Sequence, residues 1–229
     1  YCFWHRMIER KLIRMLIFSL LVILVGTAAE LIPTFLINST EASIEAVKPY
    51  TPLEVAGRDL YIREGCVGCH SQLVRPFRSE TERYGEYSKM GEFAYDHPFL
   101  WGSKRTGPDL HRLGGKYPHS WHFHHMNEPG SMSPGSIMPG YPWLIENTLD
   151  QSDLPQKIEA LRAVGVPYEE GYSAKAIADA DIQAAEIAKA LAAEGVTVTK
   201  DKEIVALIAY LQRLGTDIKK STVQTAQLP

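Results

Sequence analysis

The longest apolar stretch of the chain runs from Met15 to Ile37 with few polar interruptions. At about 1.5 Å of rise per residue, a helix of this length spans the roughly 30 Å hydrocarbon core of a bilayer. A cleaved signal peptide is the alternative, but its apolar core is usually only about 7–15 residues long. The polar sequence Asn38–Glu41 that follows is also a poor cleavage site. The pattern therefore predicts an uncleaved, single-pass transmembrane anchor over residues 15–37.

Glu30 and Pro33 interrupt this run near its far end. A carboxyl group against lipid is unfavourable, so Glu30 either reaches water at the membrane surface or faces a polar group on a neighbouring helix. Pro33 is expected to kink the last turns of the helix. Together the two residues favour an anchor that packs against a larger membrane partner.

Two later segments have the apolar period of helices. In the first, residues 53–64, the apolar side chains recur at helical spacing, and Gly65 is expected to end the helix. The second, Asp201–Leu214, is strongly amphipathic and stops before a glycine. Gly57 in mid-helix costs about 1 kcal/mol relative to alanine, which is tolerable where another helix approaches closely. Ala206 and Tyr210 on the second helix would suit a crossing at that glycine.

The stretch from Leu149 to Lys200 predicts two more helices, at about Pro155–Val164 and Ser173–Glu194. The second of these is rich in alanine. Its larger apolar members are Ile177, Ile182, Ile187 and Leu191. We find no ligand chemistry in this stretch and expect a packing or docking role for it. The polar tail 221–229 is expected to be loose, and the chain as a whole is predicted to be mainly α.

Charge is unevenly distributed along the chain, which has a formal net charge of −3. Residues 1–14 carry Arg6, Arg10, Lys11 and Arg14 against Glu9, whereas acidic residues outnumber basic ones after the apolar run. Because basic flanks stay in the cytoplasm, we expect residues 1–14 inside and the domain of residues 38–220 on the periplasmic face of the inner membrane. The acidic balance of that domain argues against nucleic-acid binding.

Cys66, Cys69 and His70 form the pattern Cys-x-x-Cys-His, which is typical of covalent attachment of c-type haem. Residues three apart lie on one face of a helical turn, so both thiols can bond to the vinyl groups of one porphyrin. His70 then lies beneath the iron as its proximal ligand. A zinc site would need a second pair of ligands, and the remaining cysteine, Cys2, lies beyond the apolar run. A redox dithiol or a disulfide is the other alternative, although no βαβ pattern surrounds the motif.

The first helix, the haem motif and the closing helix together resemble the class I cytochrome c fold. In that fold a Gly-Pro-Asp-Leu stretch follows the haem motif, as residues 107–110 do here. The resemblance implies that the carbonyl of Pro108 accepts the Nδ1 hydrogen of His70 and so orients this ligand. A plain β-turn is the alternative, because Gly-Pro-Asp is also turn chemistry.

The sixth iron ligand is expected among the methionines, and we choose Met138. Pro139 and Gly140 make a rigid loop beside it, and class I cytochromes also place this ligand in a Met-Pro pair followed by an aromatic residue. Met132, in a loop of its own, is the rival. Histidine and methionine together fill both axial positions and raise the reduction potential, so the chemistry is one-electron transfer rather than bond formation.

Five histidines lie between the Gly-Pro-Asp-Leu stretch and Met138: His111, His119, His122, His124 and His125. A metal site is one interpretation, because His122 and His125 are three residues apart on a predicted helix. No acidic or cysteine co-ligand adjoins them in the sequence, so we favour solvated or haem-edge histidines.

Basic side chains near the haem motif are candidates to hold the haem propionates: Arg75, Arg78, Lys104, Arg105 and Arg112. A guanidinium group binds carboxylates through charge-assisted hydrogen bonds. We expect Arg105 and Arg75 to make these contacts.

Further motifs make the resemblance more specific. They are Glu-Leu-Ile-Pro at 30–33, Gly-Cys-Val-Gly-Cys-His-Ser-Gln at 65–72, Trp-Gly-Ser-Lys-Arg-Thr-Gly-Pro-Asp-Leu at 101–110 and Met-Pro-Gly-Tyr-Pro-Trp-Leu at 138–144. Over residues 15 to about 145 the chain resembles the mono-haem cytochrome subunit, subunit II, of cbb3-type cytochrome c oxidases. The resemblance implies a class I cytochrome c domain with one covalent haem c, in which residues 149–200 form an inserted helical segment.

The same resemblance implies a set of partners. A catalytic subunit with haem b and a haem b3–copper centre would reduce oxygen, and a di-haem cytochrome c subunit would deliver electrons. This chain would relay them to haem b as a non-catalytic part of the enzyme. A calcium ion at the subunit boundary near the propionates is also implied, and Ser103 is where we would place it.

Two other functions fit part of the pattern. One is a freestanding, membrane-tethered cytochrome that shuttles electrons between complexes. The other is a haem-based sensor, which needs a labile sixth ligand. A tether alone would not need Glu30 or Pro33, so we favour the oxidase subunit.

Overall fold

The computed structural model describes residues 3, 7–8, 10–36 and 44–218. The predicted tail at 221–229 and part of the predicted basic segment at 1–14 lie outside these residues. The chain divides into two compact units, residues 1–42 and 43–229.

The first unit contains the long apolar helix α2 (Leu12–Leu36). Its segment Leu12–Pro33 has a mean hydropathy of 2.4 and is long and apolar enough to cross a membrane. Pro33 lies inside the helix. The predicted apolar helix is confirmed, although it begins at Leu12 rather than at Met15.

The second unit is helical, and residues 44–218 contain no strand beyond an isolated bridge between Thr148 and Lys202. Its α-helices are α3 (Pro52–Arg63), α4 (Arg78–Tyr84), α5 (His119–Asn127), α6 (Pro129–Met132), α7 (Trp143–Glu146), α8 (Leu154–Ala163), α9 (Ala176–Ala193) and α10 (Glu203–Arg213). Short 3-10 helices occur at η1 (Cys66–Gly68), η2 (Met90–Phe93) and η3 (Tyr172–Lys175). The prediction of a mainly α chain is confirmed.

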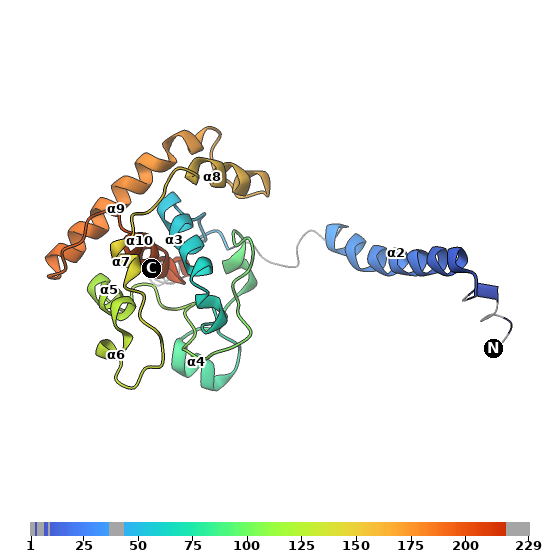
Figure 1. Ribbon diagram of the computed structural model, residues 1–229, viewed down its shortest axis with the longest axis horizontal. Coiled ribbons are helices and arrows are strands. Elements are labelled where there is room, and N and C mark those ends of the chain that lie inside the picture. Colours follow the sequence, from blue (N-terminus) through green and yellow to red (C-terminus); the bar gives the residue numbers. More distant parts are fainter. Residues whose placement is uncertain (1–2, 4–6, 9, 37–43, 219–229) are drawn as a thin grey trace, which may run out of the picture. The chain divides into compact units, whose positions relative to one another are not determined.

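Helices α3 and α10 cross at the centre of the second unit (Figure 1). A capping box starts α3: the Thr51 hydroxyl accepts a hydrogen bond from the Glu54 N–H, and the Glu54 carboxylate accepts one from the Thr51 N–H. At the crossing, a Cβ atom added to Gly57 would collide with the carbonyl of Ala206 and with Tyr210. The glycine therefore sets the close approach of the two helices, as the sequence predicted.

Helices α8 and α9 pack beside this pair (Figure 1) and lie where two inserted helices were predicted. The buried face of α9 consists of Ala176, Ala180, Ala184, Ile187 and Leu191. Ile177 and Ile182, two of the larger apolar residues noted in the sequence, are instead 42% and 61% exposed. The buried face of α9 therefore combines three alanines with Ile187 and Leu191.

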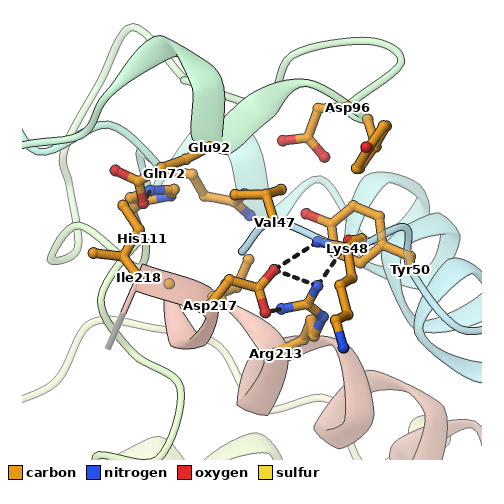
Figure 2. Close-up of a pocket in the computed structure, with 13 residues that line it drawn as sticks. Val47, Lys48, Tyr50, Gln72, Glu92, Asp96, His111, Arg213, Asp217 and Ile218 are labelled. Atoms are coloured by element: carbon orange, nitrogen blue, oxygen red, sulfur yellow. Dashed lines mark hydrogen bonds and ion pairs between the residues drawn. The ribbon is translucent and has the colours of Figure 1, made fainter. Parts of the chain in front are cut away.

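Residues 47–50, before α3, and residues 213–218, at the end of α10 and just after it, meet beside a small cavity of about 30 Å³ (Figure 2). Asp217, just after α10, accepts a hydrogen bond from the Lys48 N–H at 3.0 Å and pairs with Arg213 at 2.6 Å. Arg213 also donates to the Lys48 carbonyl at 2.8 Å. The segment that leads into α3 is thereby tied to the closing helix.

Candidate haem-binding site

The Cys-x-x-Cys-His segment forms a single tight turn directly after α3. The N–H groups of Cys69 and His70 both donate to the Cys66 carbonyl, at 3.1 and 2.9 Å. This turn places both thiols and the His70 imidazole on the wall of a cavity of about 640 Å³. That volume lies within the range of roughly 300–1,000 Å³ that is usual for cofactor pockets.

The two cysteines are not in a disulfide. Burial raises the pKa of the Cys66 thiol to about 12, and the nearby Glu64 carboxylate adds to the effect. A redox dithiol needs a thiolate, which the surroundings of Cys66 disfavour. Within the described residues, no group of three or more His, Cys, Asp and Glu side chains is placed to hold a metal ion.

His70 is held on its far side by the stretch that the sequence singled out. Its Nδ1 atom lies 2.8 Å from the Pro108 carbonyl oxygen, so Nδ1 donates and Nε2 keeps the lone pair that iron would need. Gly107 lies against the imidazole ring, where an added Cβ atom would collide with it. The Gly107 N–H donates to the Cys69 carbonyl at 3.0 Å. Pro108 thus contacts His70 as the class I resemblance implied.

Asp109 is a structural residue of this wall that the sequence analysis did not single out. Its buried carboxylate accepts hydrogen bonds from the Ser71 hydroxyl at 2.7 Å, the Leu73 N–H at 2.8 Å and the His111 N–H at 2.9 Å. The contact with His111, two residues on, is a local turn that Gly-Pro-Asp can signal. The contacts with Ser71 and Leu73 join distant segments, so the sequence gives no direct signal for them.

Arg105 and Arg75, the residues expected to hold the propionates, both pair with Glu80. Burial alone would raise the pKa of Glu80, but the two guanidinium groups outweigh it and lower that pKa to about 2. Neither arginine lines the cavity. The cationic residues that do line it are Arg83, Arg112 and Lys116. Propionate contacts from Arg105 and Arg75 therefore stay a prediction.

Met138 also lines the cavity, within a wall formed by the loop of residues 133–139. The rival, Met132, does not line it. Met126 does, but it is 8% exposed and belongs to the hydrophobic core. The arrangement favours Met138 over Met132 as the methionine that faces the two thiols and His70.

The histidines between these walls differ in their surroundings. His122 is fully buried, with no hydrogen-bond partner on either ring nitrogen, and burial lowers its pKa to about 4. His111 is also buried and lies 2.8 Å from the Glu92 carboxylate. The expectation of solvated or haem-edge histidines is wrong for His111, which is buried and does not line the cavity, whereas His124 is exposed. His122 and His125 both line the cavity.

The rest of the cavity wall is mostly apolar. It includes Leu110, Leu113, Met126, Leu207, Leu211 and the ring of Tyr61. The Tyr61 hydroxyl is buried close to the Gln72 side chain. Apolar walls, cations on the lining and unpartnered buried polar atoms fit a large flat cofactor that carries a few acidic groups. The residues present therefore fit a haem.

A protein-family model described as "Cytochrome C oxidase, mono-heme subunit/FixO" matches residues 5–218. The chain belongs to this FixO family. No curated protein matched the chain in a direct comparison. Membership makes the chain a mono-haem subunit of a cbb3-type cytochrome c oxidase, with a role in electron transport. The apolar helix α2 supports a membrane location for this FixO-family subunit.

The calcium site expected at Ser103 has no further support. Ser103 is exposed and does not line the cavity. The calcium ion implied by the resemblance therefore stays a prediction.

Proposed function

We propose that this subunit relays single electrons through one haem c, bound covalently to Cys66 and Cys69. His70 and Met138 are its axial ligands in this proposal. The observation that carries the proposal is that two thiols, the oriented His70 imidazole and the Met138 thioether line the same cavity. When bound, haem c supplies a one-electron ferric–ferrous couple.

The protein's own residues set the reduction potential of this couple and keep small ligands from the iron. Pro108 fixes the orientation of His70, and a ligand held in one orientation keeps the reorganisation on electron transfer small. The Met138 thioether would supply the second protein ligand to the iron, which would leave no open site for oxygen or peroxide. A thioether ligand and apolar walls favour the ferrous state, so they raise the reduction potential.

The direction of electron flow and the location follow from the family resemblance and the anchor. Electrons arrive from a di-haem cytochrome c subunit and pass to haem b of the catalytic subunit, where oxygen is reduced. Helix α2 crosses the inner membrane with residues 1–14 in the cytoplasm and the cytochrome domain in the periplasm, where covalent haem attachment takes place. A calcium ion near Ser103 would lie at the boundary with the catalytic subunit.

Purification of the tagged chain in mild detergent tests the proposal. The expected result is a complex that contains haem b and copper, with one haem on this chain that survives denaturation because it is covalently attached. Cys66→Ala together with Cys69→Ala should abolish that covalent haem. A chain that comes out alone with its haem would instead be a freestanding shuttle, and a chain without haem would contradict both functions.

Optical spectra test the choice of axial methionine. The ferric protein should show the far-red charge-transfer band of a methionine–iron bond. Met138→Ala should abolish this band, and the control Met132→Ala should keep it. The reverse pattern would show that Met132 is the ligand.

A further inference from the structure

The cavity wall that carries Met138 also carries a histidine with no assigned role. After the loop of residues 133–139, the Tyr141 N–H donates to the Met126 carbonyl at 2.7 Å, so the chain returns directly onto the last turn of α5. His125 precedes Met126 on this turn and lines the same cavity as Met138. The methionine loop and the end of α5 therefore form one wall.

The His125 ring is held in place by stacking. It lies parallel to the Trp121 ring with 4.5 Å between the ring centres, and Trp121 stacks in turn on Tyr117 at 4.1 Å. The ammonium group of Lys116 lies over the Tyr117 ring at 5.5 Å. Trp121, Tyr117 and Lys116 thus hold the imidazole through ring contacts.

His125 is also chemically available. Of its two ring nitrogens, Nδ1 is buried without a hydrogen-bond partner among the described residues. Burial lowers the pKa of His125, which favours the neutral ring. A neutral imidazole with a free lone pair is a strong ligand for haem iron.

We propose that His125 is a reserve axial ligand, which binds the haem iron opposite His70 whenever the Met138 thioether is absent or displaced. The proposal rests on the proposed function, because it needs a haem in this cavity. Its consequence is that the iron stays six-coordinate after methionine loss. Small ligands such as oxygen, peroxide and carbon monoxide would then remain excluded from a haem that works beside an oxygen-reducing centre.

Two neighbouring histidines serve as comparisons. His122 lines the same cavity, but within the described part of the chain both of its ring nitrogens are buried without a partner, whereas of the two His125 nitrogens only Nδ1 is. His124, on the same helix, is exposed and does not line the cavity. If position on the wall decides the reserve ligand, only His125 should have this role.

The test uses the full chain with its covalent haem, in a Met138→Ala background. The expected spectrum of Met138→Ala alone is low-spin and six-coordinate, with the far-red band lost, a lower reduction potential and slow binding of carbon monoxide by the reduced form. Adding His125→Ala should convert the haem to a high-spin form that binds carbon monoxide rapidly. Adding His124→Ala, the matched control, should leave the low-spin spectrum unchanged. Haem content per chain confirms that each variant has folded and matured.

Three results would overturn the proposal. Met138→Ala could be high-spin by itself, the low-spin form could survive the loss of His125, or it could disappear with His122→Ala instead. These results are distinct from a failure of the proposed function. That failure would appear in the unmodified chain, as a missing haem or a missing methionine band.

Discussion

The two walls of the haem cavity are built differently. The wall behind His70 joins segments that are distant in sequence: Nδ1 of His70 donates to Pro108, and the Asp109 carboxylate accepts hydrogen bonds from Ser71 and Leu73. The wall around Met138 depends on a loop whose neighbouring residue, Ile137, is 81% exposed. The hydrogen bond that the Met138 N–H makes is a local one, to the Ser136 hydroxyl at 3.2 Å.

This difference suggests a division of tasks. His70, the proposed proximal ligand, is oriented by the Pro108 carbonyl beside a buried network. Met138, the proposed distal ligand, lies on a loop, as the proposed exchange for His125 requires. Each of the predictions below tests one side of this comparison.

The largest expected effect is on the proximal wall, at Asp109. Replacing it with alanine leaves several buried donors without an acceptor, and we expect a loss of about 3–5 kcal/mol in the free energy of unfolding. Chemical denaturation of the full chain measures this loss. The exposed Asp153 is a matched control, for which the change should stay within about 0.5 kcal/mol. Equal effects at the two positions would show that no special network holds this wall.

A smaller effect is expected from a single added methyl group. In Gly107→Ala the new Cβ atom collides with the His70 ring, and overpacking of this kind costs about 1–3 kcal/mol. The displaced imidazole should also weaken the bond to iron, which the low-spin spectrum reports. Gly130→Ala on the distal side is the control, because nothing lies within 4 Å of its added Cβ atom. A normal spectrum for Gly107→Ala would mean that the proximal wall accommodates the added methyl group without displacing the His70 ring.

The two walls should respond to acid in different pH windows. Burial lowers the folded-state pKa of His122 to about 4, from about 6.5 in the unfolded chain. The unfolded chain therefore binds more protons in this interval, and stability should fall as the pH drops from about 6.5 to about 4. The pKa of Glu80 is lowered from 4.5 to about 2, so its contribution is lost only as the pH falls from about 4.5 toward 2.

Denaturation curves across this pH range check the order of the two windows. His122→Leu should remove the loss of stability between about pH 6.5 and pH 4. Glu80→Gln should remove the loss between about pH 4.5 and pH 2. If His122→Leu leaves the upper window unchanged, another group near α5 is responsible for it.

Much of the proximal side could be predicted from the sequence, because local patterns specify it. The Cys-x-x-Cys-His turn, Pro108 and the crossing at Gly57 each have a signal in a short stretch of residues. Asp109 and Glu80 could not be recognised, since their partners are brought near only by the fold. The same holds on α9, where Ile177 and Ile182 are exposed while Ile187 and Leu191 are buried together with three alanines. The buried state of His122 also depends on packing that no local pattern reveals.

The most direct test of the account is the far-red methionine band in the purified chain, measured with the mass of the peptide that contains Cys66 and Cys69. The account predicts one haem attached to that peptide and a band that Met138→Ala abolishes. A peptide without haem, or a band that persists in Met138→Ala, would contradict the central claim that one covalent haem lies between His70 and Met138.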